Sequence, residues 1–185
     1  MSELAQLLAV ASFTALALAL AVFIRRAGRF IAETREVELF RRATADLAVR
    51  VETSLDGVAG RIDLVRRRTI DAREIVENVA AATDAIARYT DEARALRGPG
   101  TAAEEIRDAF IAELERAGRA LEMVEHGCSI LSSARVGGRE LEAQTAIKRG
   151  YLNVLHAREA IRRYAARAAM VGTPQQARLF ERRNA

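Results

Sequence analysis

The chain contains few of the residues that build disulfide frameworks and metal sites. Among its 185 residues, Cys128 is the only cysteine, and His126 and His156 are the only histidines. A single cysteine excludes an intramolecular disulfide and a Cys-x-x-Cys zinc site. Neither histidine lies in the Glu-x-x-His pattern of carboxylate-bridged metal bundles, because Glu122 is four residues before His126 and Glu159 follows His156. We therefore expect no metal and no cofactor.

The chain is also poor in aromatic residues and in lysine. Lys148 is the only lysine, aromatic residues make up 5% of the sequence, and tryptophan is absent. The net charge of +4 comes from arginines that are interleaved with acidic residues, and the few tyrosines and phenylalanines do not line a basic stripe. Because nucleic-acid binding needs a groove of cations or a platform for stacked bases, we expect no nucleic-acid partner.

Motifs that carry catalysis are missing as well. The glycine-rich sites follow no predicted strand and lack the Gly-Lys-Ser/Thr signature of a phosphate loop. Ser132 and Ser133 have no histidine partner in their immediate surroundings that would activate a hydroxyl group. We therefore expect no enzymatic activity, and we assign no catalytic and no cofactor-binding residue.

One long apolar run dominates the N-terminal part of the chain. From Leu4 to Ile24 no residue is charged, and only Gln6, Ser12 and Thr14 are polar. A helix of this length reaches about 32 Å, close to the ~30 Å hydrocarbon core of a bilayer. The run therefore predicts a single membrane-spanning helix that anchors the chain.

The charges on either side of this run predict its orientation. Arg25, Arg26 and Arg29 follow it directly, whereas only the α-amino group and Glu3 precede it. Since arginine-rich flanks stay in the cytoplasm, we expect the cell membrane as location, the N-terminus outside and residues 25–185 inside. The same three arginines form a candidate lipid-facing basic flank. A cleaved signal peptide is the competing interpretation, but no basic region precedes the run and no small-residue cleavage site follows it.

The rest of the chain has the composition and periodicity of long helices. The sequence is 50% hydrophobic and 29% charged, and no segment has the pattern of a strand. We predict helices over 25–67, 72–97, 102–136 and 139–171, because apolar residues recur there at steps of three and four. The predicted buried positions are Val37, Phe40, Thr44, Leu47, Val51, Val58, Ile62 and Val65 in the first helix, Ile75, Val76, Val79, Thr83, Ile86 and Ala93 in the second, Phe110, Leu114, Ala117, Leu121, Val124, Cys128 and Leu131 in the third, and Leu141, Ile147, Tyr151, Val154, Ile161, Ala165 and Ala168 in the fourth.

The break between the first two helices is predicted from capping residues. Asp71 stands three residues before Glu74, which is the spacing of a capping box, and Ile70 and Ile75 are placed to form an apolar staple across it. If Asp71 is not a break, residues 44–97 form one helix of about 80 Å, whose membrane-proximal part has to pair with another chain.

Glycine and proline mark the later breaks. Short connections favour antiparallel neighbours, so we predict an all-α, up-down-up-down four-helix bundle over 25–172, continuous with the anchor over 1–24 and followed by a flexible tail over 173–185. The expected breaks are Gly98-Pro99-Gly100 after the second helix, a capping box of Thr101 with Glu104 at the start of the third, a reversal at Gly137-Gly138, and Gly172 with Pro174 after the fourth.

The hairpin between the third and fourth helices has the most varied polar residues in the chain. It contains both histidines, the only cysteine and the only lysine within an Arg/Glu/Ala background. Such variety is found at binding surfaces. The alternative interpretation is that these residues are ordinary polar positions of a helical hairpin. The candidate partner-binding surface consists of His126, Gln144, Lys148, Tyr151, Asn153 and His156.

These features predict a single-pass membrane protein whose cytoplasmic bundle acts as a scaffold, adaptor or assembly factor. Its expected partners are the lipid bilayer and either another membrane or cytoplasmic protein or a second copy of the chain. The alternative is a helical module that senses a small ligand and signals through its membrane helix, although the predicted seams offer few polar groups. The plan also resembles the peripheral-stalk b subunit of rotary ATP synthases. The breaks at Gly98-Pro99-Gly100 and Gly137-Gly138 depart from the extended helix of that subunit, so a stalk-like role is the more distant alternative.

Overall fold

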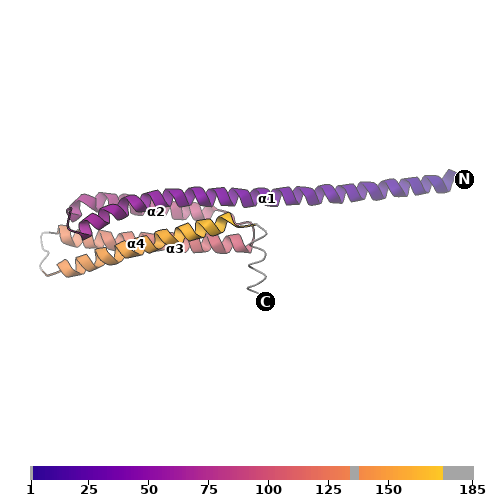
Figure 1. Cartoon of the computed structure of the whole chain (residues 1–185). Coiled ribbons are helices and arrows are strands. Elements are labelled where there is room, and N and C mark those ends of the chain that lie inside the picture. The colour runs from indigo at the N-terminus through magenta and orange to yellow at the C-terminus, as the bar shows by residue number, and fades with distance from the viewer. Residues whose placement is uncertain (1, 134–137, 173–185) are drawn as a thin grey trace, which may run out of the picture.

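The computed structural model of the chain is all-α, and its helices pack side by side as a bundle (Figure 1). It describes residues 2–133 and 138–172, without the side chains of residues 2–15, 17, 27 and 29–31. Consecutive long helices run in opposite directions, and α2 and α4 each pack against both α1 and α3. The predicted all-α bundle is therefore confirmed. The elements are α1 (Ser2–Arg66), a short 3-10 helix η1 (Ala72–Ile75), α2 (Val76–Ala95), α3 (Thr101–Ser132) and α4 (Glu140–Ala169).

Helix α1 is far longer than its neighbours, and its N-terminal part projects beyond the bundle (Figure 1). The described side chains of residues 16–36 are exposed, and α1 first packs against other helices at Val37 and Phe40. In the part of the chain that the structure describes, no helix is long and apolar enough to cross a membrane. Of the predicted span from Leu4 to Ile24, the side chains of residues 4–15 and 17 lie outside the described residues.

The core of the bundle consists of the predicted helix seams. In α1 every predicted position from Phe40 to Val65 is buried, and Val37 is half-buried. The α3 seam is buried from Phe110 to Cys128. From Leu47 onwards these seams meet in one continuous apolar cluster, and Phe40 belongs to a second, smaller cluster with Ile106 and Ala168.

The prediction for the start of the α4 seam is wrong at Leu141. This side chain is 76% exposed, whereas Ala143 and Ile147 are buried. Two residues correspond to about 200° of rotation around a helix, so Leu141 lies on the side opposite to Ala143. The α4 seam begins at Ala143, an alanine that the sequence pattern did not distinguish from its many neighbours.

The two predicted capping boxes have different outcomes. At Asp71 the prediction is confirmed: the Arg73 N–H donates to Asp71 Oδ1 at 2.8 Å, and the Asp71 N–H donates to Glu74 Oε1 at 3.0 Å. At Thr101 it is wrong, because Gly100 is the N-cap, with φ +88°, and no side chain caps this end of α3. The Gly100 carbonyl instead accepts the N–H groups of Ala103 and Glu104, both at 3.1 Å.

Two glycines bring α3 and α4 into close contact. A Cβ atom on Gly127 would lie 2.7 Å from Ile147 Cγ1, and one on Gly150 would lie 2.5 Å from Val124 Cγ2. Both glycines are buried, and each faces the backbone of the opposite helix at a separation that a side chain would not fit. Sequence reasoning did not single out either residue. Together they fix how closely the α3–α4 hairpin packs.

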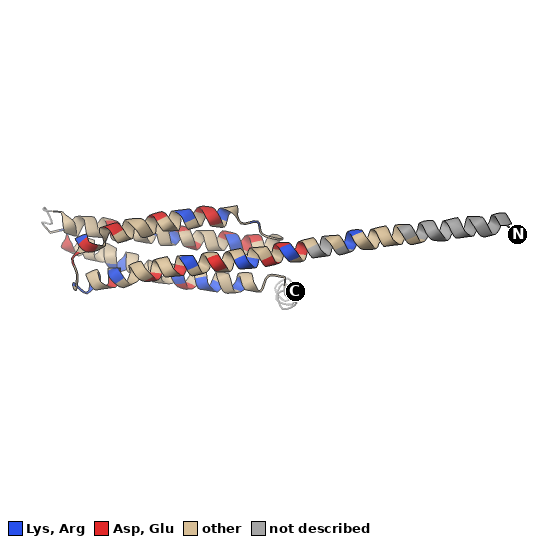
Figure 2. Cartoon of the chain, turned by 90° about the horizontal axis from the view of Figure 1, so that it is seen from above, with Lys and Arg blue, Asp and Glu red and all other residues tan. Residues whose placement is uncertain are grey.

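Ion pairs between helices surround this core. Arg50 donates to both carboxylate oxygens of Glu92, which joins α1 to α2, and its guanidinium lies 5.3 Å from the Tyr89 ring centroid. Arg158 pairs with Asp56 and joins α4 to α1. The described surface of the bundle carries both signs of charge along every long helix (Figure 2).

Candidate functional site

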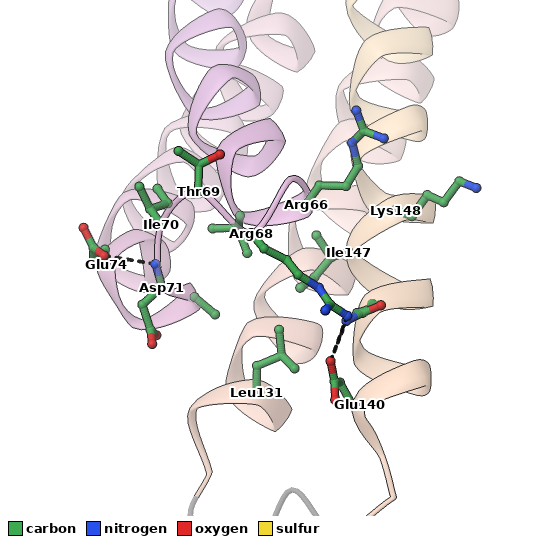
Figure 3. Close-up of a pocket in the computed structure, with 13 residues that line it drawn as sticks. Arg66, Arg68, Thr69, Ile70, Asp71, Glu74, Leu131, Glu140, Ile147 and Lys148 are labelled. Carbon is green, nitrogen blue, oxygen red and sulfur yellow. Dashed lines mark hydrogen bonds and ion pairs between the residues drawn. The ribbon is translucent and has the colours of Figure 1, made fainter.

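The described chain has a cleft at the end of the bundle that is farthest from the N-terminus. We call it the tip cleft; its volume is about 660 Å³, and it lies between the α1–η1 turn and the α3–α4 hairpin (Figure 3). Charged and apolar residues from these elements converge on one opening. The lining residues are Val65, Arg66, Arg68, Thr69, Ile70, Asp71, Ala72, Glu74, Leu131, Glu140, Gln144, Ile147 and Lys148.

One wall of the cleft is the C-terminal end of α1. The Arg68 N–H donates to the Val65 carbonyl and the Thr69 N–H to the Leu64 carbonyl, both at 2.9 Å, which is the hydrogen-bond pattern of a Schellman motif. This motif needs a left-handed residue, and Arg68 takes that position with φ +59°. Arg68 is the only residue other than glycine with a positive φ in the described chain. Glycine adopts this conformation more readily than arginine, so the backbone at Arg68 is strained.

The Arg68 side chain crosses the cleft. Its Nη2 atom lies 3.0 Å from Glu140 Oε1, in the first turn of α4, and Gln144 Nε2 donates to the same oxygen at 2.8 Å (Figure 3). A single carboxylate is thus held by a guanidinium from one side of the cleft and by an amide from the other. This pair connects the end of α1 to the beginning of α4.

The remaining charged groups of the cleft differ in their hydrogen-bond and ion-pair partners. Asp71 and Glu74 accept hydrogen bonds within the capping box. Arg66 donates to Asp63 Oδ1, and its guanidinium lies 5.2 Å from the Tyr151 ring centroid. Lys148 is exposed at the edge of the cleft and has no ion-pair partner among the described residues. Among the described residues the cleft therefore has one cation without an ion-pair partner, Lys148, and two carboxylates without one, Asp71 and Glu74.

The candidate partner-binding surface is divided between two sides of the bundle. Gln144 and Lys148 line the tip cleft, and Tyr151 lies one turn further along the same face of α4, where it contacts Arg66. His126 instead lines a second concavity of about 580 Å³, which it shares with Met123, Leu141, Glu142 and Arg149.

Asn153 and His156 do not line the tip cleft. Asn153 is five residues after Lys148, which corresponds to about 140° of rotation around α4. Asn153 is half-buried and His156 is exposed. Tertiary structure therefore brings together Gln144, Lys148 and Tyr151. It adds Arg66 and Arg68 from the end of α1, which are not part of the candidate surface chosen from the sequence.

Cys128 lies in the core and is chemically protected. It is fully buried, and burial raises the pKa of its thiol to about 11, with the nearby Glu125 carboxylate adding to the effect. A thiol with this pKa is protonated at neutral pH and is a poor nucleophile. No group of His, Cys, Asp and Glu residues in the described part of the chain is arranged to hold a metal ion.

Near the second concavity, charge pairing affects Glu142. A hydrogen bond from Arg139 lowers the pKa of the Glu142 carboxyl group, and the charge of His126 contributes less.

In the candidate lipid-facing flank, Arg25 and Arg26 are exposed, and the Arg29 side chain lies outside the described residues.

Comparisons of the chain with protein-family models, curated proteins and solved structures gave no match.

Proposed function

We propose that this chain is a membrane-anchored adaptor or scaffold that presents a helical bundle to a cytoplasmic partner. The N-terminal part of α1 is the proposed anchor, with the N-terminus outside the cell, and the bundle is the proposed partner-binding part. The observation that carries the proposal is the long α1 helix, which leaves the bundle and continues into an apolar stretch (Figure 1).

The apolar side chains of this stretch have no covering protein surface in the described chain. Leu16, Leu18, Leu20, Val22 and Phe23 are between 58% and 70% exposed, on all sides of the helix. Water is an unfavourable environment for so large an apolar surface, at a cost of about 25 cal/mol for each Å². Lipid would cover every side of a single helix at once. The exposed Arg25 and Arg26 follow directly and suit the headgroup region.

The proposal also predicts the distance of the bundle from the membrane. With the anchor ending at Ile24, the first packed residue, Val37, would lie about 20 Å further along the helix. The end of α1 at Arg66 would lie about 63 Å along it. The tip cleft would then be the part of the bundle most distant from the bilayer, where a cytoplasmic protein has free access.

Membrane fractionation tests the anchor. We expect the full-length chain to sediment with membranes and to remain there after washing with high salt and with alkaline carbonate. The double variant Leu18→Arg and Leu20→Arg should move into the supernatant with its helical content unchanged, because these exposed residues do not contribute to the bundle core. Extraction of the unmodified chain by carbonate would refute the anchor.

Capture from membranes tests the adaptor role. Full-length chain purified in mild detergent is expected to bring a second protein in constant stoichiometry. Recovery of the chain alone, as a monomer or homo-oligomer, would contradict a stable adaptor complex. A large membrane complex containing the chain would instead support the stalk-like alternative.

A ligand-sensing module is the second candidate, and the tip cleft is the observation that favours it. A cleft of about 660 Å³ has the size of a small-molecule site, and Arg66 and Arg68 link it to the end of α1. The core itself favours this role less, because its buried polar residues in the described chain are Thr44, Thr90 and Glu113. A thermal-shift screen of small molecules tests the candidate: a reproducible rise in the unfolding midpoint supports it, and a flat screen contradicts it.

A further inference from the structure

We propose that a second copy of the chain packs in parallel against the exposed side of α1, so that two bundles stand side by side along this helix. The parallel arrangement rests on the proposed membrane anchor, because two copies anchored in one bilayer have their N-termini on the same side. We call the contact surface the outer row of α1. Its members are Leu39, Arg42, Asp46, Val49, Thr53, Gly57, Gly60 and Leu64.

The outer row lies on one side of α1 and faces away from the bundle. Its members follow one another at steps of three or four residues, which keeps them within about 80° of the helix circumference. All of them are exposed, whereas the seam from Phe40 to Val65 is buried on the other side. Leu39 and Val49 are 58% and 62% exposed, and Leu64 is 40% exposed. Three bulky apolar side chains on one side of α1 therefore have no cover in the described chain.

From Val49 to Leu64 the outer row contains no charged residue, although 29% of the chain is charged. The only hydroxyl group in this part, that of Thr53, donates to the Val49 carbonyl at 2.9 Å, so its hydrogen bond is made within the helix. This part of the row would bring no charge into an interface. The exposed apolar residues of α4 differ in this respect, because charged residues lie between them: Lys148 between Leu141 and Leu152, and Glu159 and Arg163 between Leu152 and Met170.

The three glycines of α1 lie on this same side. Gly57 and Gly60 belong to the outer row, and Gly28 lies about three turns before the row begins. A Cβ atom on any of them would meet no neighbouring atom within 4 Å. Glycine weakens a helix interior relative to alanine, and at Gly127 and Gly150 the close approach of another helix explains its presence. A second α1 helix against the outer row would supply the same explanation here.

The two charges of the outer row are compatible with a second copy. Arg42 and Asp46 pair within their own helix, with Glu38 at 2.7 Å and with Arg50 at 3.1 Å, and keep their charges. In a parallel pair with a two-fold axis, Arg42 of one copy lies about one turn from Asp46 of the other, and the reverse contact is equivalent. The charges of the row cancel, so the two rows do not repel each other.

The length of α1 favours a second copy over an unrelated partner. From Leu16 to Leu64 the exposed side of α1 extends about 72 Å, which at a width of about 10 Å offers about 700 Å² on each copy. This area is close to the roughly 800 Å² per partner of a stable interface, and the part from Leu39 to Leu64 alone offers only about half of it. A partner therefore has to follow α1 from the apolar stretch to the tip, and a second α1 helix does so along its whole length.

Disulfide cross-linking tests the proposal. Val49→Cys and Leu64→Cys are introduced one at a time into the full-length chain, and cell lysate is treated with copper-phenanthroline, which oxidises two thiols to one disulfide. We expect a covalent dimer as the main product of both variants, because each position faces its own counterpart in a parallel pair. An antiparallel pair would bring together at most one of the two positions. The unmodified chain should stay monomeric on the denaturing gel, since Cys128 is buried.

Leu152→Cys is the matched control on α4. Leu152 is an apolar side chain of similar exposure, 44%, and this variant should give little dimer. In mild detergent, light scattering should report a dimer for the unmodified chain. Thr53→Glu should weaken dimerisation at least about tenfold with helical content unchanged, because like charges would face each other across the interface.

Two results would overturn the proposal. One is little or no cross-linking at positions 49 and 64, and the other is a yield at position 152 equal to theirs. Membrane fractionation reports the anchor and capture of a second protein reports the adaptor role, so failure of the dimer is distinguishable from failure of either.

Discussion

At the scale of single residues, the left-handed backbone of Arg68 has a cost that can be measured. Arg68→Gly should raise the free energy of unfolding by about 1 kcal/mol, because glycine relieves the left-handed strain. Chemical denaturation measures this effect. The control Arg67→Gly, where φ is not positive, should instead destabilise the chain; a stability loss in Arg68→Gly would contradict the strain.

Cys128 provides a second prediction at this scale. With a pKa of about 11, the thiol should react with a colorimetric disulfide reagent far more slowly than a free cysteine at pH 8, and the rate should rise about tenfold per pH unit above it. Addition of denaturant should restore the ordinary rate, because an unfolded cysteine has a pKa near about 8.5. Rapid labelling of the native chain would show that this part of the core is open.

At the scale of elements, the α3–α4 interface depends on its two glycines. Gly127→Ala and Gly150→Ala should each lower the free energy of unfolding by about 1–3 kcal/mol, because the new methyl group overlaps Ile147 or Val124. Gly118→Ala is the control on α3: its Cβ would have 3.8 Å to its nearest neighbour, Ile86, so it should gain up to about 1 kcal/mol in helix propensity. Equal effects at all three positions would contradict the close packing.

The pair that joins α1 to α2 predicts a pH dependence. The hydrogen bond from Arg50 lowers the pKa of Glu92 below its unfolded value of about 4.3. A lowered carboxyl pKa contributes stability above the unfolded pKa and loses it as the pH falls through the folded one. Unfolding free energy should therefore decline below about pH 5, and less so in Glu92→Gln. Identical pH profiles for the two proteins would exclude a contribution from this pair.

The elements also show what sequence could and could not predict. The seams of α1 and α3 were recognisable because bulky apolar residues recur every three or four positions. The Asp71 break was recognisable because a capping-box spacing and an apolar staple coincide there. The beginning of the α4 seam was misplaced because the buried position there is an alanine, Ala143, while the bulkier Leu141 is exposed. Small residues carry little signal in a sequence rich in alanine.

The tip cleft was only partly predictable for a related reason. Gln144, Lys148 and Tyr151 stood out by their chemistry, but nothing local indicated that Arg68 crosses to Glu140, 72 residues later. His126, Asn153 and His156 belong to the same hairpin in sequence, but none of them lines the tip cleft, and His126 lines the second concavity. Pairing between distant segments depends on how the four helices meet, which residue periodicity alone does not determine.

At the scale of the whole molecule, the proposed function depends on α1 as one continuous helix that would link a bilayer to the bundle. The helix has no break from Ser2 to Arg66, so the bundle and the apolar stretch are joined without a flexible connection. An upright bundle would place Glu36 about 18 Å, and the end of α1 about 63 Å, from Ile24 along the helix. The two ends of the bundle should therefore differ clearly in distance from the membrane.

The most direct test is energy transfer from a donor dye on the chain to acceptor lipids in reconstituted vesicles. Glu36→Cys and Thr69→Cys place the dye on exposed residues at the two ends of the bundle, and the buried Cys128 should stay unlabelled. With a dye pair whose range lies between the two distances, we expect strong transfer from position 36 and weak transfer from position 69. Equal transfer from both positions, or none from either, would contradict a membrane-anchored bundle that points its tip cleft away from the bilayer.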